Sequence, residues 1–207
     1  MRSHRVDSTG RFLAADSPYW ARVSVAQVTM MPTPLAMQPT AYIRNSWQGR
    51  PYGEVQPIAV ASVHDGETWC LRVTWTSSHQ GPANFPDALA IALPVRNSPV
   101  LALMGAVDAP IHYLRWSSDK KGLLSLLATG IGLSAPGPEL KREAHAVTDG
   151  SVRHLVLARA MGGSGDVAPL SSGKKTGIGF ALWHGANDER AGIKAFSVDW
   201  MELALDV

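Results

Sequence analysis

The stretch Trp69-Cys70-Leu71-Arg72-Val73-Thr74-Trp75 decides the fold class, because large apolar residues alternate in it with smaller or polar ones. In a β-strand, successive side chains point to opposite faces, so residues two apart share a face. The two tryptophans and the apolar residues between them therefore face one way, and Cys70, Arg72 and Thr74 face the other. This pattern predicts a strand with one buried side.

The same signals recur along most of the chain. A turn sequence, His64-Asp65-Gly66, precedes the first stretch, and residues 88–93 are apolar on both faces, as in a strand inside a sandwich. Segments with strand patterns are 23–28, 58–63, 88–93, 111–116, 152–157, 177–183 and 194–205. Short strands at this spacing predict an all-β, mainly antiparallel β-sandwich. Residues 123–127 are expected to form a short helix, and residues 160–176 a long Gly/Ser/Pro-rich loop.

Composition limits the function classes. The 207 residues are expected to form a single domain over 1–207, with 1–18 as an extended N-terminal arm. Net charge is +2 and the basic residues are dispersed, so nucleic-acid binding is not indicated. The lone cysteine, Cys70, excludes an intrachain disulfide, a cysteine-ligated iron–sulfur cluster and a CxxCH haem attachment. The longest apolar run, 88–95, is too short to span a membrane.

Several catalytic and binding motifs are absent from the sequence. The glycine-rich segment lacks phosphate-loop spacing, since Ala168 stands where glycine is needed and Lys175 where Ser or Thr is needed. No Gly-x-Ser-x-Gly elbow and no HExxH motif occurs. His112, inside a predicted strand, and His184, at the end of another, are the two histidines that merit attention.

Two further residues stand out by position. Met104 precedes Gly105 ahead of a polar corner, although most methionines in such a setting simply fill the core. Near the C-terminus, the apolar strand 177–183 is followed by a polar turn and a second strand, and Lys194 begins that second strand. By local pattern alone the hairpin has no evident purpose.

In order along the chain, the segments resemble the haem b subunit (γ subunit) of type II dimethyl sulfoxide reductase family molybdoenzymes. The group includes ethylbenzene dehydrogenase, dimethyl sulfide dehydrogenase and chlorate reductase. The matching pieces are 69–75, Phe85-Pro86-Asp87-Ala88 to Pro94, Leu103-Met104-Gly105, 113–116, 154–159 and 180–194. Two features depart from the family pattern: His184 stands where an acidic residue is common, and 153–159 lacks the usual Trp and following Pro.

The resemblance implies one non-covalent haem b in a β-sandwich pocket, with Met104 and Lys194 as the axial ligands of the iron. His184, Lys174 and Lys175 are the alternative ligands. It also implies a non-catalytic electron-transfer subunit of an oxidoreductase complex. Its expected partners are an iron–sulfur β subunit, a molybdopterin α subunit and a carrier such as a soluble c-type cytochrome. The expected location is the periplasm by co-export with a partner; because no signal peptide is visible, the cytoplasm is the alternative.

A different class stays open beside this one. A haemless carbohydrate- or ligand-binding β-sandwich module would use exposed tryptophans to stack on sugar rings. The candidate platforms are Trp47, Trp69, Trp75, Trp116 and Trp183. A haemless scaffold subunit of the same complex would need neither Met104 nor Lys194.

Overall fold

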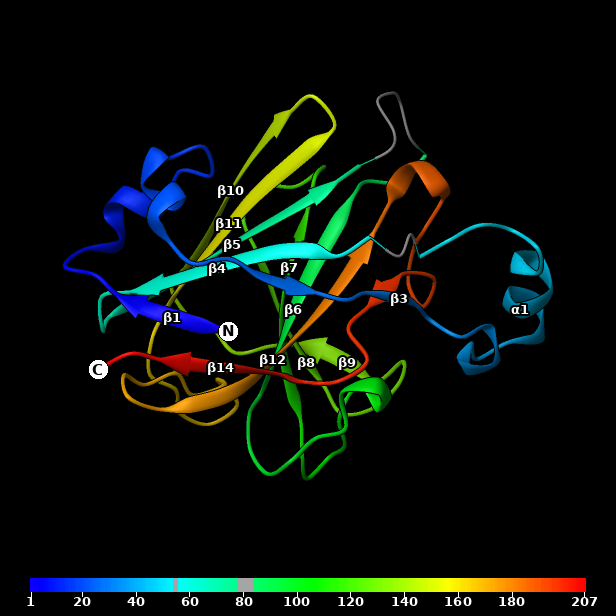
Figure 1. Cartoon of the computed structure of the whole chain (residues 1–207). Helices are drawn as coiled ribbons and strands as arrows, with labels where there is room; N and C mark the ends of the chain where they lie inside the picture. The colour runs from blue at the N-terminus through cyan, green and yellow to red at the C-terminus, as the bar shows by residue number, and fades with distance from the viewer. Residues whose placement is uncertain (54–55, 78–83) are drawn as a thin grey trace.

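Two packed β-layers make up most of the computed structural model, which describes residues 1–53, 56–77 and 84–207 (Figure 1). Hydrogen bonds join the described strands edge to edge in one continuous order. That order is β10 (Arg142–Asp149), β11 (Val152–Ala160), β5 (Thr68–Thr76), β4 (Ile58–His64), β1 (Arg2–Arg5), β14 (Met201–Leu205), β12 (Lys175–Trp183), β6 (Ala88–Pro94), β7 (Ile111–Ser117), β8 (Leu124–Ala128) and β9 (Ser134–Pro136). Along this order only β1 pairs in parallel, with β4 and β14, so the predicted all-β, mainly antiparallel sandwich is confirmed.

The first layer contains β10, β11, β5, β4, β1 and β14, and the second contains β6, β7, β8 and β9. Strand β12 belongs to both layers. Its first residues pair with β14, and from Gly179 onward it pairs with β6. Between the layers lies the main apolar core, which contains Trp69, Leu71, Val73 and Trp75, all at most 3% exposed. The alternation that predicted the buried side of β5 is therefore correct.

The other face of β5 is covered by the N-terminal segment. Cys70 is fully buried there, in a cluster with Phe12 and Trp20 of the short 3-10 helices η1 (Thr9–Phe12) and η2 (Pro18–Arg22). Within residues 1–18, expected as an extended arm, the structure has strand β1 and the 3-10 helix η1, and this segment covers the sheet. The physical reason is the apolar surface around Cys70, which needs shielding from water.

Three local elements differ from what the sequence predicts. Residues 124–128 form strand β8 rather than a helix, because β7 offers a free edge and pairs with them over five residues. The expected strand 194–205 is divided into β13 (Ala195–Phe196) and β14, with β13 pairing to the second layer. Strand β10 is polar and largely exposed, so its sequence carries no burial pattern to predict it.

The expected loop at 160–176 is partly ordered by packing. Gly162 forms an isolated bridge with Leu170, Ala168 and Leu170 are buried, and the last residues of the segment already belong to β12. Two short strands, β2 (Ala26–Val28) and β3 (Met31–Pro32), add to the edges of the two layers by pairing with β4 and β13.

The outer face of the second layer is only partly covered, and this positions the candidate site. The covering elements are η3 (Leu35–Met37), α1 (Ala41–Trp47) and η4 (Leu101–Leu103), with α1 projecting at the right of Figure 1. A further 3-10 helix, η5 (Gly185–Asn187), follows β12. Thr40 caps α1, since its Oγ1 accepts a hydrogen bond from the Ile43 amide at 3.2 Å. None of the helices that the structure describes is long and apolar enough to cross a membrane.

Candidate functional site

A cavity of about 530 Å³ lies on the outer face of strands β6, β7 and β12. Its floor contains Ala90, Ala92 and Ala181, and Ala181 pairs directly with Ala90 across the two strands. Side chains that alternate with these alanines, such as Leu89 and Ile91, point into the sandwich core. Small residues at adjacent strand positions leave a shallow, flat recess above the sheet, and the volume is typical of a cofactor or small-molecule site.

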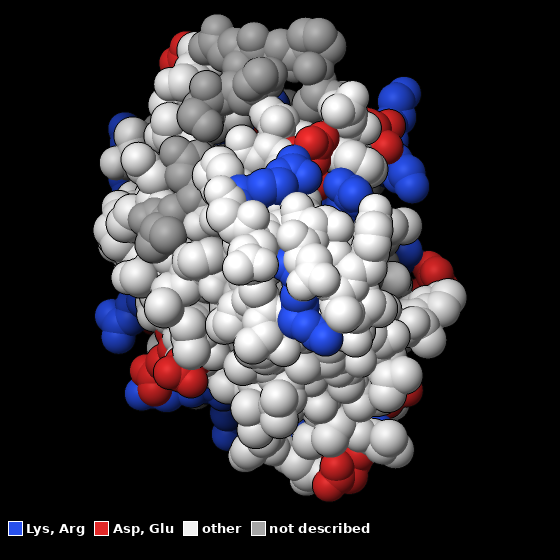
Figure 2. Space-filling view, turned by 90° about the vertical axis from the view of Figure 1, so that its right-hand side faces the viewer, with Lys and Arg blue, Asp and Glu red and all other residues white. Residues whose placement is uncertain are grey.

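The remaining walls come from segments far apart in the sequence. Met37, Gln38 and Ile43 approach from η3 and α1, and residues 131–134 approach from the connection between β8 and β9. Figure 2 shows the side of the molecule that carries α1: around its middle, uncharged atoms surround Lys and Arg side chains. No Asp or Glu is found among the described residues that line the cavity.

Met104 lines the cavity from the loop between β6 and β7. Its backbone is left-handed, with φ of 57° and ψ of 35°, and its amide donates to the Leu101 carbonyl at 2.9 Å. Gly105 is also left-handed, and a Cβ there would meet the Ala109 carbonyl oxygen at 2.8 Å. A left-handed methionine costs about 1 kcal/mol or more and clusters at functional sites, so the strained turn directs attention to this side chain.

Lys194 lines the same cavity from the segment that leads into β13. Its carbonyl accepts hydrogen bonds from the Thr33 amide at 2.9 Å and the Thr33 hydroxyl at 3.2 Å, which fixes the backbone. The Nζ atom lies 3.5 Å from the Ala191 carbonyl oxygen and 5.4 Å from the centre of the Trp183 ring. Burial lowers the pKa of Lys194 to about 8. At pH 7 about one amine in ten is then neutral, against about one in three thousand for an exposed lysine.

The turn that delivers Lys194 is organised by a buried carboxylate. Glu189, only 1% exposed, accepts hydrogen bonds from the Gly53 amide at 2.8 Å and the His184 amide at 2.9 Å. Gly185 packs so closely that a Cβ would meet the Phe85 carbonyl oxygen at 1.9 Å, which excludes any other residue there. The polar turn between the two strands is therefore fixed by specific contacts.

The alternative ligands lie elsewhere. His184 is buried at 3% exposure and is not among the described residues that line the cavity. Lys175 is exposed and pairs with Glu202 at 3.0 Å, six residues (about 20 Å) along β12 from Ala181. Lys174 directly precedes Lys175, at the same end of β12. The cavity thus brings together Met104 and Lys194 and none of the three alternatives.

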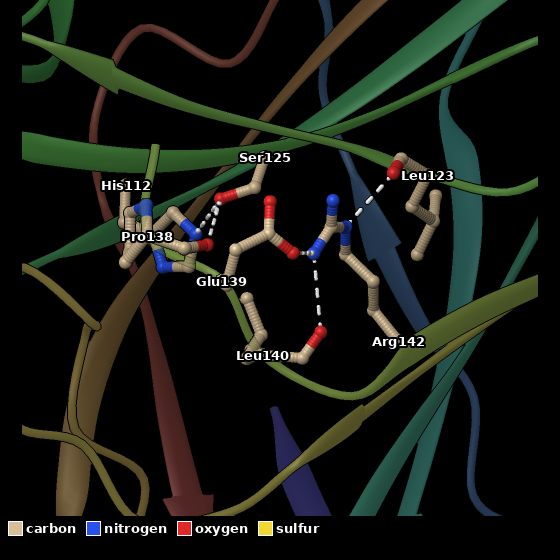
Figure 3. Close-up of polar contacts among 7 residues, drawn as sticks. All are labelled: His112, Leu123, Ser125, Pro138, Glu139, Leu140 and Arg142. Atoms are coloured by element: carbon tan, nitrogen blue, oxygen red, sulfur yellow. Dashed lines mark hydrogen bonds and ion pairs between the residues drawn. The ribbon is translucent and has the colours of Figure 1, made fainter. Parts of the chain in front are cut away.

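His112 is also not among the described residues that line the cavity. Figure 3 shows it beside Ser125 and Pro138. It is fully buried, its Nδ1 accepts from the Ala168 amide at 3.4 Å, and its Nε2 lies 3.0 Å from Ser125 Oγ. The Ser125 hydroxyl donates to the Pro138 carbonyl at 2.8 Å. Burial, with the charges of Arg159 and Arg142, lowers the pKa of His112 to about 4. These contacts give His112 a structural role as a neutral, hydrogen-bonded core residue.

No family model matches the chain. It is 29% identical over 155 residues to the chlorate reductase subunit gamma of Ideonella dechloratans, covering 72% of this chain and 64% of that subunit. It is 25% identical over 202 residues to the dimethylsulfide dehydrogenase subunit gamma of Rhodovulum sulfidophilum, covering 90% and 72%. The chain is similar in sequence to these γ subunits.

A third relative extends the comparison. A Haloferax mediterranei protein, provisionally named as a respiratory nitrate reductase heme subunit, is 25% identical over 154 residues, covering 70% of this chain and 55% of that protein. The chain thus spans less than two thirds of the length of two of these relatives.

Solved structures support the fold of the chain. A family 9 carbohydrate-binding module from Caldicellulosiruptor kristjanssonii, in complex with glucose, matches with a TM-score of 0.55 at 8% identity, covering 100% and 95% of the two chains. A Bacteroides uniformis protein, provisionally described as carbohydrate-binding, matches at 0.56 and 10% identity, covering 100% and 98%. Four of the five tryptophans considered for sugar stacking, Trp47, Trp69, Trp75 and Trp116, are buried. Only Trp183 of the five lines the cavity.

Three features of the site were not predicted from the sequence. The alanine floor could have been anticipated from Ala88 to Ala92, where alanines alternate with larger residues. Arg115, whose side chain lines the cavity, and Glu189, which holds the turn, carry no local signal. Within the described residues no group of three or more His, Cys, Asp or Glu could hold a metal ion.

Proposed function

We propose that this chain binds one haem b non-covalently in the cavity and serves as the electron-transfer subunit of an oxidoreductase complex. Met104 and Lys194 would be the axial ligands of the iron. The observation that carries the proposal is that these two residues, ninety positions apart in sequence, line one largely apolar cavity. One relative is itself named as a heme subunit, and two others as gamma subunits of oxidoreductases, which supports haem binding and a role in an oxidoreductase complex.

The residues present fit a haem. The alanine floor leaves room for a flat macrocycle, and the walls offer apolar side chains to its edges. A buried Arg115 Nε without a hydrogen-bond partner among the described residues gives the cavity a charged group that a ligand can satisfy. A bound haem would supply a one-electron carrier, whose potential depends on the axial ligands and on burial.

Each proposed ligand has a suitable chemistry. The Met104 thioether is a soft, neutral donor that favours reduced iron and raises the potential. The Lys194 amine can bind a metal only when it is neutral, and burial has already lowered its pKa to about 8. Two protein ligands leave no open coordination position, so this arrangement favours electron transfer over substrate or oxygen chemistry.

The complex and its location are part of the proposal. The expected partners are an iron–sulfur β subunit and a molybdopterin α subunit, with a soluble c-type cytochrome or a similar protein as the external carrier. The support for them is the naming of the relatives as gamma subunits. The periplasm stays a prediction from the family resemblance.

The test is a visible spectrum of the purified chain reconstituted with haem. The wild type should give a sharp reduced α-band, and Met104→Ala and Lys194→Ala should each lose the low-spin spectrum. Lys174→Ala and Lys175→Ala are matched controls, because both are lysines outside the cavity, and they should keep it. A colourless wild type would overturn the haem assignment. An unchanged Lys194→Ala spectrum together with loss in His184→Ala would overturn the lysine assignment alone.

A further inference from the structure

Arg115 occupies a distinctive place in the cavity. It lies on β7, paired with Ala90 of β6 on one side and Leu124 of β8 on the other, next to the alanine floor. Its guanidinium carbon lies 5.4 Å from the centre of the Trp183 ring, the same ring that Lys194 Nζ approaches at 5.4 Å. The cavity therefore gathers two basic side chains against one aromatic wall.

The guanidinium of Arg115 has no anionic partner within the part of the chain that the structure describes. Its Nε is buried and makes no hydrogen bond there, and no carboxylate lies within ion-pair distance of its side chain. Asp119 lies in an exposed turn and accepts a hydrogen bond from Ser117, which lowers the pKa of Asp119 more than the charge of Arg115 does. A buried donor without an acceptor is costly, so its persistence at the cavity points to a ligand acceptor.

Two other arginines place more of their donors on protein acceptors than Arg115 does, although Arg159 Nη1 also lacks a hydrogen-bond partner among the described residues. Arg142 donates from Nε to the Leu123 carbonyl at 2.8 Å and pairs with Glu139 at 3.2 Å (Figure 3). Arg159 donates to three carbonyl groups at 2.8–3.0 Å. Arg115 differs from both in facing a cavity rather than protein acceptors.

The charges that face the cavity specify the ligand chemistry. An arginine stays charged over the whole physiological pH range. Arg115 therefore keeps one positive charge in a cavity whose described lining holds no acid. The planar fork of a guanidinium matches a carboxylate in a bidentate arrangement.

We infer that Arg115, supported by the Trp183 ring, binds a carboxylate of the ligand in this cavity. This inference rests on the proposed function, in which the ligand is a haem and the carboxylate is one of its propionates. Arg115 then selects the orientation of the macrocycle, while Met104 and Lys194 bind its metal.

The experiment compares protohaem with its dimethyl ester, which keeps the metal and the ring but has no free carboxylates. Each is titrated into the wild-type chain, into Arg115→Met and Arg115→Lys, and into Arg96→Met, which removes a surface arginine paired with Asp166. The readouts are the dissociation constant and the low-spin α-band of the bound form.

We expect the wild type and Arg96→Met to bind the acid about tenfold to a hundredfold more tightly than the ester. Arg115→Met should bind the acid and the ester about equally tightly while its α-band is preserved. Arg115→Lys should keep part of the preference for the acid. Equal binding of acid and ester by the wild type would overturn the inference without using any variant. A full preference in Arg115→Met would overturn it as well.

The same data distinguish a failure of the proposed haem function from a failure of the carboxylate assignment. Absence of a low-spin band with both ligands in the wild type means that the proposed haem function has failed. A low-spin band with an unchanged acid preference in Arg115→Met means that only the carboxylate assignment has failed. If Arg115→Met does not fold, as judged by its circular dichroism, the wild-type comparison and Arg115→Lys decide the outcome.

Discussion

Removal of the Glu189 carboxylate should destabilise the chain and displace Lys194. Glu189→Ala leaves two buried backbone amides, those of Gly53 and His184, without the acceptor that they now contact at 2.8 and 2.9 Å. Each unsatisfied buried donor costs about 1–3 kcal/mol, so the free energy of unfolding should fall by about 2–6 kcal/mol. That is a large share of the about 5–15 kcal/mol typical of a domain.

The local consequence follows from the connections of the same turn. Gly53, held by Glu189, packs so closely that a Cβ would lie 2.6 Å from Pro32 and 3.0 Å from the Lys194 carbonyl oxygen. Loosening Gly53 therefore releases the segment that fixes the Lys194 backbone. Haem binding by Glu189→Ala should weaken by more than its stability loss alone implies, and the low-spin band should broaden or decrease.

The assay is urea denaturation followed by tryptophan fluorescence, with haem titration in parallel. Glu202→Ala is the matched control, since that glutamate is 61% exposed in a surface ion pair with Lys175 and should contribute about 0–1 kcal/mol. Glu189→Gln, which keeps one acceptor oxygen and presents a donor to the other amide, should fall between the two. If Glu189→Ala unfolds within 1 kcal/mol of Glu202→Ala, as an order-of-magnitude criterion, the reasoning is refuted.

Two further predictions concern Met104 and His112. Because φ at Met104 is 57°, haem-free Met104→Gly should be more stable to urea than Met104→Ala by about 1 kcal/mol, while both lack the low-spin band; equal stabilities would contradict the strain. His112 has a folded-state pKa of about 4, below the unfolded value of 6.5, so the unfolded chain binds more protons between these values and stability is lost as the pH falls through that window. His112→Gln should flatten this loss by about 3 kcal/mol in urea denaturation at a series of pH values, and an unchanged slope would count against the assignment.

The sequence predicted the strands whose side chains alternate against a common core. Trp69 to Trp75 and Ile58 to Val63 are β-strands as expected, because a period of two with one buried face leaves few other solutions. The helix predicted over residues 123–127 was wrong, because residues 124–128 form β8. A run of leucines fits a helix and a buried strand equally, and only the edge of β7 decides between them. Strand β10 escaped prediction because it is largely exposed and has no large apolar residue apart from Val147.

The candidate site divides in the same way. Met104 and Lys194 were named from the family resemblance, and the chain's own local pattern left each as an ordinary residue. Their place on one cavity depends on strand pairing between β12, β6 and β7, which brings distant segments together. The buried acceptor Glu189 and the unsatisfied donor of Arg115 are likewise properties of the folded chain.

The sequence by itself thus determined the all-β class, the buried faces of the principal strands and, through its ordered motifs, the relation to the γ subunits. Only the tertiary structure decided that an alanine floor lies beneath Met104 and Lys194, and that Arg115 faces the same space without an acid. The physical reason is the range of the forces involved. Alternation is set by neighbouring residues, whereas burial, desolvation and the pairing of charges depend on which segments meet in the folded chain.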